Sequence, residues 1–220
     1  MSIAYFSTAY FAPVQYYSKL LQYDNIYIEQ YENYLKQTYR NRCILMGTNG
    51  FLKLSVPVKF GRSKILMKDV CIANYENWQK QHFTTIETAY KSSPYYDYYI
   101  HEFDFVFTKK RKFLLDLNLE ILDKSLELLK LQVEYSLTKS FIHHVQNAND
   151  YRYKIHPKPN KNICDDNSIY KPYWQVFDYK YQFIPNLSIL DVFFNLGLDS
   201  LSYLRSCISS VGTSDNTKLV

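Results

Sequence analysis

Residues 183–197 read Phe-Ile-Pro-Asn-Leu-Ser-Ile-Leu-Asp-Val-Phe-Phe-Asn-Leu-Gly, and this stretch contains both a helix start and a helix end. Ser188 followed three residues later by Asp191 has the pattern of a capping box, in which the two side chains satisfy backbone N–H groups of the first turn. The residues that follow are apolar, and Gly197 supplies the left-handed residue that commonly ends a helix. The stretch therefore predicts a C-terminal helical segment over 183–207.

The same helix start is also a candidate ligand site. A buried helix N-terminus beside polar Asn186 and Asp191 can hold a small anionic or hydroxylated ligand. Capping and ligand binding both remain open for these residues.

The composition predicts one folded domain over residues 1–220, because 47% of the residues are hydrophobic and 21% are charged. Aromatic residues make up 18%, with 23 Tyr and 14 Phe. Tyrosine suits cleft linings and interfaces, which leaves a homo-oligomer open. The net charge is only +5, and the one basic run, 109–112, falls between two helical patterns. We therefore expect no nucleic-acid partner.

The cysteines indicate a reducing compartment. Four scattered cysteines form no C-x-x-C pair, and the N-terminus lacks a signal-peptide pattern. No apolar run reaches the length of a membrane span. His143, His144, His156 and Cys164 match no zinc spacing, so no metal site is expected. The sequence predicts a cytoplasmic protein without a membrane span.

The first part of the chain, 1–75, reads mainly as strands. A strand over 3–11, a helix over 14–21 and a strand over 25–30 form the opening unit of many α/β enzymes, whose ligands bind at the carboxyl ends of strands. This placement puts Gln15 and Glu29 near a site. The Asn49-Gly50 pair predicts a hairpin between strands 43–47 and 51–58, and a further strand is expected over 69–74.

The middle part, 76–131, reads as helical, with helices over 78–90, from Ser93 through Phe107, and over 113–131. Residues 132–182 are polar and irregular, with a short strand or extended segment at 173–177. The predicted fold class is therefore α/β: a mixed sheet built from N-terminal strands and a hairpin, covered by the helical middle section and the C-terminal helix.

Three side chains carry the chemistry that the residues alone suggest. His82 shares one helix face with aromatic residues, where it could act as an acid or base or as a hydrogen-bonded core residue. Lys36 and Arg42, in a polar stretch without helical or strand period, could hold phosphates or form surface salt bridges. The sequence leaves both alternatives open.

Several blocks, in this order and spacing, resemble the WbqC-like family of bacterial surface-polysaccharide gene clusters over nearly the whole chain. The blocks are Tyr10-Phe11-Ala12-Pro13-Val14-Gln15-Tyr16-Tyr17, Lys36-Gln37-Thr38-Tyr39-Arg40-Asn41-Arg42, Leu54-Ser55-Val56-Pro57-Val58, Trp78-Gln79-Lys80-Gln81-His82 with Tyr90 and Pro94, Tyr173-Trp174-Gln175-Val176-Phe177, and Pro185-Asn186-Leu187-Ser188-Ile189-Leu190-Asp191. Two positions depart from the family pattern: Gln15 stands close to the position of a glycine, and Glu29 replaces an aspartate.

The resemblance implies a role in attaching an acyl or aminoacyl group to a nucleotide-linked amino sugar, with an activated acyl donor. In this hypothesis His82, Asp191 and Glu29 are the catalytic set, with His82 as general base. The substrate-binding set is Tyr10, Gln15, Lys36, Asn41, Arg42, Trp78, Gln175 and Asn186. The alternative is a module that binds a sugar nucleotide or a partner protein without chemistry, since no nucleophile motif is recognisable.

Overall fold

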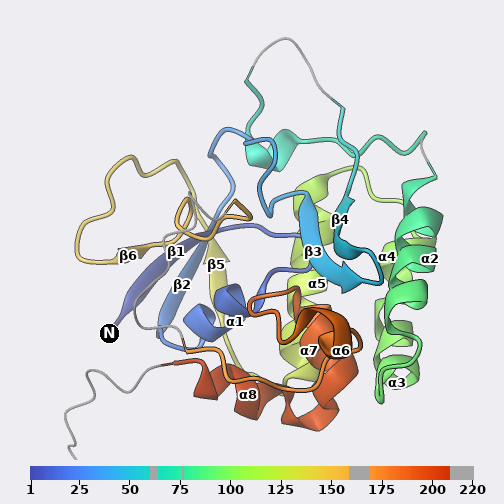
Figure 1. Cartoon of the computed structure of the whole chain (residues 1–220). Coiled ribbons are helices and arrows are strands. Elements are labelled where there is room, and N and C mark those ends of the chain that lie inside the picture. Colours follow the sequence, from blue (N-terminus) through green and yellow to red (C-terminus); the bar gives the residue numbers. More distant parts are fainter. Residues whose placement is uncertain (60–63, 76, 159–168, 209–220) are drawn as a thin grey trace, which may run out of the picture.

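A four-stranded parallel sheet organises the N-terminal part of the protein (Figure 1). The computed structural model describes residues 1–59, 64–75, 77–158 and 169–208. The strands are β1 (Ile3–Ser7), β2 (Asn25–Glu29), β5 (Tyr135–Leu137) and β6 (Asn149–Asp150), in the order β5-β2-β1-β6. Each neighbouring pair is parallel, so all four strands end at the same edge.

Alternating side chains anchor this sheet in the core. Ala4 and Phe6 of β1 and Ile26 and Ile28 of β2 are buried, as the period of two predicts. β1 pairs with β2 from Ile3 opposite Asn25 to Ser7 opposite Glu29. The first strand is shorter than predicted, because the backbone leaves the extended region: Phe11 has a φ of 40°, and the Tyr10 N–H donates to the Tyr39 carbonyl at 2.8 Å.

The predicted hairpin is confirmed as β3 (Arg42–Gly47) and β4 (Gly50–Ser55), paired from Arg42 opposite Ser55 to Gly47 opposite Gly50. Gly50 has a φ of 109°, which explains the glycine in this turn. The strand predicted over 69–74 is wrong. The chain there forms a short 3-10 helix, η1 (Met67–Asp69). Two isolated bridges follow, from Ile72 to Val58 and from Cys71 to Phe113, and single bridges do not make a strand.

The helical middle section is confirmed, with α2 (Trp78–Tyr90) and α5 (Leu114–Leu128) close to their predicted bounds. The helix predicted from Ser93 through Phe107 is instead three pieces: α3 (Tyr96–Ile100), the 3-10 turn η2 (His101–Phe103) and α4 (Asp104–Thr108). In both figures α5 lies between the parallel sheet and the group formed by α2, α3 and α4.

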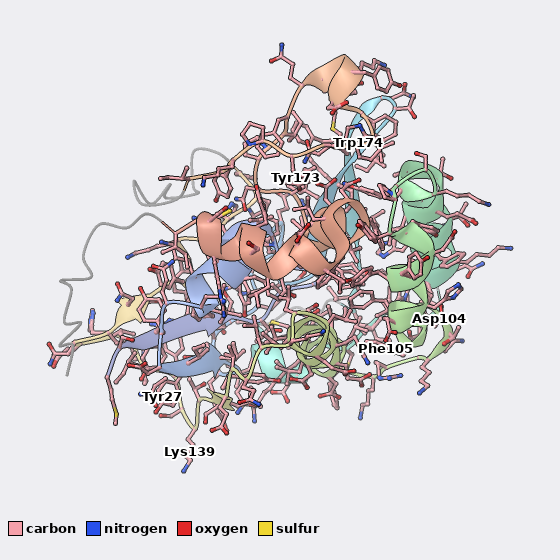
Figure 2. The ribbon with its side chains drawn as sticks, turned by 90° about the horizontal axis from the view of Figure 1, so that it is seen from below. Tyr27, Asp104, Phe105, Lys139, Tyr173 and Trp174 are labelled. Carbon is pink, nitrogen blue, oxygen red and sulfur yellow. The ribbon has the colours of Figure 1, made fainter. Side chains whose placement is uncertain are left out.

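The C-terminal segment packs on the first helix, α1 (Val14–Leu20). It contains α6 (Asp178–Tyr181), α7 (Ile189–Leu196), a 3-10 turn η3 (Gly197–Asp199) and α8 (Ser200–Ser206), and both α7 and α8 contact α1. Figure 2 shows Tyr173 and Trp174 on the extended chain that leads toward α6, far across the view from Tyr27 of β2. Residues 173–177 form no strand in this segment.

The α/β fold with parallel strands, an antiparallel hairpin and surrounding helices is confirmed. The irregular region predicted over 132–182 contains the two short strands β5 and β6, and its residues 159–168 lie outside the described part. Cys43, Cys71 and Cys207 are free thiols, and Cys164 also falls outside the described part. None of the described helices is long and apolar enough to span a bilayer.

Candidate functional site at the carboxyl edge of the parallel sheet

The carboxyl edge of the parallel sheet is the position where α/β proteins usually bind their ligands. β2 and β5 lie on one side of β1 and β6 lies on the other, so the strand order reverses between β1 and β6. In open α/β sheets, ligands bind in the crevice outside the carboxyl ends at this switch point. β1 ends there at Ser7 and β6 at Asp150.

Five ionisable side chains converge on this edge, and we name them the edge cluster: Glu29, Glu32, Arg40, Asp150 and Arg152. Arg152 links two strand ends, because its Nη1 donates to Glu29 at 3.1 Å while its Nε and Nη2 donate to the two oxygens of Asp150 at 2.9 and 2.7 Å. Glu29 also accepts from the Thr138 hydroxyl at 2.7 Å and from the Tyr31 N–H at 2.8 Å. Strand ends β2, β5 and β6 are thereby joined.

The second ion pair of the cluster joins Arg40 and Glu32. The guanidinium is bidentate, with Nε at 2.7 Å and Nη2 at 2.5 Å from the two carboxylate oxygens. Arg40 Nη2 also donates to the Arg152 carbonyl at 3.1 Å, so the two pairs form one network. The side chains of Glu29 and Glu32 are 0% exposed, and those of Arg152 and Arg40 only 1% and 4%.

The pKa values of two carboxyl groups in the cluster are shifted in opposite directions. Loss of water raises the pKa of Glu32, and the nearby charge of Glu29 raises it further, while Arg40 only partly offsets both. Burial would also raise the pKa of Asp150, but hydrogen bonds and the positive charge of Arg152 outweigh it and lower that pKa. Carboxyl groups with diverging pKa values are the usual sign of an acid–base pair.

The crevice above the cluster is nearly closed. A cavity of about 10 Å³, room for about one water, lies beside Arg40. Its walls are Ser7, Thr8, Ala9, Tyr16, Tyr39, Arg40, Tyr151 and Ile155. The ring of Tyr153, which is 45% exposed, lies over both guanidiniums, 5.6 Å from Arg40 and 5.9 Å from Arg152. Tyr153 is thus the exposed cover of a buried charged site.

The structure brings three of the residues predicted from sequence together in the core, away from solvent. The Tyr10 hydroxyl and His82 Nδ1 are 2.9 Å apart, and the Trp78 ring packs edge-on against His82. Burial lowers the pKa of His82 to about 4, with a smaller opposing effect from a hydrogen bond to the Ser55 backbone. His82 is therefore neutral at physiological pH, with only 5% of its surface exposed.

Asp191 is also buried, in a separate network. Its carboxylate accepts from Tyr90 at 2.8 Å, from Gln175 at 2.8 Å and from the Tyr173 hydroxyl. Burial raises the pKa of Asp191, and these hydrogen bonds only partly oppose the shift. Tyr90 lies eight residues, about 12 Å along the axis of α2, from His82, so Asp191 and His82 belong to different clusters.

Gln15 and Asn186 meet at the start of α1. The Asn186 Oδ1 accepts from the Gln15 N–H at 2.9 Å, and its Nδ2 lies 3.4 Å from the Gln15 side-chain oxygen. Ser188 caps α7 as predicted, accepting from the Leu190 N–H at 3.4 Å, and it donates to the Phe11 carbonyl. The second half of the predicted capping box is absent, because the Ser188 N–H donates to the Ile44 carbonyl and not to Asp191.

The remaining predicted binding residues are spread over the start of the hairpin and the chain before it. Asn41 is buried and donates to the Val56 carbonyl at 2.9 Å. Arg42 begins β3 and is half-buried, whereas Lys36 is exposed. Of the predicted site residues, Glu29 alone belongs to the edge cluster.

Four residues of the edge cluster were missed from sequence. Glu32 and Arg40 lie in the polar stretch that directly follows β2. Their position after a predicted strand is the one sequence feature that indicates a place at the carboxyl edge of the sheet. Asp150 and Arg152 follow a two-residue strand that leaves no periodic pattern. Within the described ranges, no three His, Cys, Asp or Glu side chains are arranged to hold a metal ion.

Comparison with known proteins gives one match. The sequence model of the WbqC-like protein family matches residues 8–164, a span that contains the whole edge cluster and His82 but not Gln175, Asn186 or Asp191. No curated protein and no solved structure matches the chain significantly. The match extends over more than half of the 220 residues and contains four of the six blocks recognised in the sequence, while the blocks at 173–177 and 185–191 lie outside it. The chain belongs to the WbqC-like protein family.

Proposed function

We propose that the protein is a transferase of bacterial cell-surface glycan biosynthesis, which attaches an acyl or aminoacyl group to a nucleotide-linked amino sugar at the edge cluster. The observation that carries this proposal is the set of five ionisable side chains at the carboxyl edge of the parallel sheet, four of which are buried while the Asp150 side chain is 31% exposed. Buried ion pairs are weak stabilisers, because desolvation offsets most of their attraction. Their concentration at the usual ligand position of an α/β sheet therefore favours a functional role.

Glu32 is the residue that we assign as general base. Its raised pKa suits a group that must take up a proton from an amine near neutral pH. The sugar amine attacks the acyl carbonyl, a C–N bond forms, and the bond from that carbon to the sulfur or oxygen of the donor breaks. Glu32 receives the amine proton and passes it to the departing sulfur or oxygen.

Arg40 and Arg152 are the residues that we assign to substrate binding. A guanidinium binds phosphate in two-point geometry, and Arg40 already lines the small cavity beside Ser7 and Thr8. Tyr153 covers both guanidiniums, so substrate entry requires this exposed ring to move aside. In this proposal His82 and Asp191 stabilise the core and position their neighbours.

A test of this proposal is product formation. The protein is incubated with a nucleotide-linked amino sugar and a panel of acyl thioesters and aminoacyl esters, and products are detected by mass spectrometry. A positioned base is worth roughly 10²–10⁴-fold in rate, so Glu32→Gln should lose turnover by about that factor. Glu120→Gln is the matched control, because Glu120 forms a similar bidentate pair with Arg111 on the surface.

A non-catalytic binding module is the second candidate function. It is favoured by the closed network, in which Glu29, Glu32 and Asp150 each already have an arginine partner. The same experiment separates the two functions. Sugar-nucleotide binding without product across the whole donor panel would rule out the transferase and leave the binding module.

A further inference from the structure

A second cleft is lined by residues of α3 and of the C-terminal end of α5. In Figure 1, α3 lies on the far side of α5 from the parallel sheet. The volume of the cleft, about 490 Å³, falls within the range of small-molecule sites. The lining residues are Tyr95, Tyr98, Tyr99, Glu102, Glu127, Leu128, Lys130 and Leu198. They come from three separate pieces of chain: α3 with the adjoining η2, the C-terminal end of α5, and η3.

Three apolar side chains of this cleft are exposed to solvent. Tyr98 is 76% exposed, Leu198 82% and Tyr95 37%. Large exposed apolar groups that cluster in one concave place mark a binding site more often than single exposed ones do. Tyr99 forms the floor, because its ring stacks on Phe193 at 5.3 Å with an interplanar angle of 8°.

Backbone contacts hold the Tyr95 ring of the cleft in place. The Tyr95 N–H donates to the Phe194 carbonyl at 3.0 Å, which fixes the backbone at the start of α3. Gly197 has a φ of 55°, and a Cβ at this position would lie 2.7 Å from the Tyr95 ring. The glycine therefore lets the ring lie directly against the backbone of η3. A fixed ring loses little conformational entropy when a ligand binds.

The charges of the cleft cancel. Lys124 lies between the two carboxylates, at 3.5 Å from Glu102 and 2.8 Å from Glu127, and Lys130 supplies a second positive charge. Two lysines and two glutamates leave no net attraction for an anion or a cation. Each of these ion pairs uses the Oε2 atom of its glutamate, so the Oε1 atoms remain available as hydrogen-bond acceptors.

We propose that this cleft binds an uncharged saccharide. One face of a sugar ring presents C–H groups that pack on aromatic rings, and its hydroxyls donate to carboxylates in charge-assisted hydrogen bonds. The exposed Tyr98 and Tyr95 rings would pack against the C–H face of the sugar, and Glu102 and Glu127 would accept hydrogen bonds from its hydroxyls. The site is separate from the edge cluster and would hold a glycan without reacting with it.

Saturation-transfer NMR tests this proposal with the methyl glycosides of glucose and N-acetylglucosamine as probes, and with glucuronate and choline as charged comparators. The uncharged sugars should receive saturation, and their affinity should not change between low and high salt. Tyr98→Ala should weaken sugar binding about five- to tenfold. Tyr179→Ala is the matched control, because Tyr179 is 77% exposed on α6, and it should leave binding unchanged.

Three results would overturn the saccharide site: no saturation of either sugar, equal loss in the Tyr98 and Tyr179 variants, or preferential binding of a charged comparator. Sedimentation adds a fourth, since a dimer that Tyr98→Ala dissociates would show that a second copy of the chain covers the cleft. Glu32→Gln separates this site from the proposed transferase site. It should leave sugar binding at the α3 cleft unchanged.

Discussion

His82 is held neutral inside the protein by the residues around it. The Tyr10 hydroxyl lies 2.9 Å from Nδ1, the Trp78 ring covers one side, and burial lowers the pKa of the imidazole to about 4. The unfolded chain, in which histidine has its ordinary pKa of about 6.5, takes up a proton first as the pH falls. The contribution of neutral His82 to stability is therefore complete above pH 6.5 and is lost toward pH 4.

This shift predicts the acid sensitivity of the fold. Between pH 6.5 and 4 the wild type should lose about 3 kcal/mol of unfolding free energy through His82, and His82→Gln should flatten this part of the curve. Urea unfolding across this pH range measures both. His101→Gln, on an exposed side chain of η2, is the control for the loss of an imidazole. An unaltered slope in the His82 variant would contradict the buried, neutral imidazole.

Asp191 acts as the common acceptor of three side chains from α2 and the chain before α6. Asp191→Ala leaves the hydroxyls of Tyr90 and Tyr173 without this acceptor, whereas Gln175 keeps its bond to the Ile184 carbonyl, and we expect a loss of about 3 kcal/mol in unfolding free energy. Sugar-nucleotide binding to the folded fraction should persist. Asp199→Ala, whose side chain caps no N–H of α8, is the control for chemical denaturation. Full stability with lost binding would instead make Asp191 a site residue.

At the scale of elements, hydrogen bonds at the N-termini of α1 and α7 connect the first and last parts of the chain. Asn186 has a φ of 59° and accepts from the Gln15 N–H in the first turn of α1, while the Val14 N–H donates to the Leu187 carbonyl. Ser188 caps α7 and donates to the Phe11 carbonyl. The stretch before α7 therefore caps its own helix and a helix more than 160 residues earlier.

Two substitutions of Asn186 separate its cap from its backbone conformation. Asn186→Gly keeps the left-handed backbone but loses the cap, which should cost about 1 kcal/mol. Asn186→Ala loses the cap and also strains the backbone, so about 2 kcal/mol is expected. Thermal and urea unfolding measure the order. Alanine tolerated as well as glycine would contradict the strain.

The elements that sequence predicted well are those with a strong local pattern. α2 was predicted at its bounds because Trp78, His82, Ile86 and Tyr90 repeat at helical spacing, and the hairpin because Asn49-Gly50 fits its turn. β5 and β6 have only three and two residues, and pairing with β2 and β1 creates them, so no local pattern exists. The second half of the capping box does not form, because the Asp191 carboxylate accepts hydrogen bonds from Tyr90 and Gln175 instead.

At the scale of the whole molecule, the candidate site depends on residues that lie far apart in the chain. Glu29 is predicted as a site residue because it lies near the end of a recognisable strand, and the structure places it at the carboxyl end of β2. Asp150 and Arg152 could not be predicted, because only the pairing of β6 with β1 brings them to Glu29. The sequence therefore predicts the end of β2 but not the residues Asp150 and Arg152 that lie against Glu29 there.

We expect the buried charges of the edge cluster to serve substrate binding at a cost in stability of the fold. Arg40→Met leaves the buried carboxylate of Glu32 without its partner and should cost about 3–5 kcal/mol of unfolding free energy. The double variant Arg40→Met/Glu32→Met removes both charges and should recover at least half of this loss, while sugar-nucleotide binding stays lost. Urea unfolding and calorimetric titration measure the two properties. A double variant as unstable as the single one would indicate a purely structural ion pair.

Chemical-shift mapping tests most directly whether the edge cluster is the substrate site. A nucleotide-linked amino sugar is titrated into the ¹⁵N-labelled protein, and the backbone amides that shift are assigned. We predict that the largest shifts occur at the carboxyl ends of β1, β2 and β6, at Ser7, Thr8, Tyr31 and Arg152, and that Arg40→Met removes them. Shifts centred on His82 and Asp191, with the edge residues unmoved, would contradict the account.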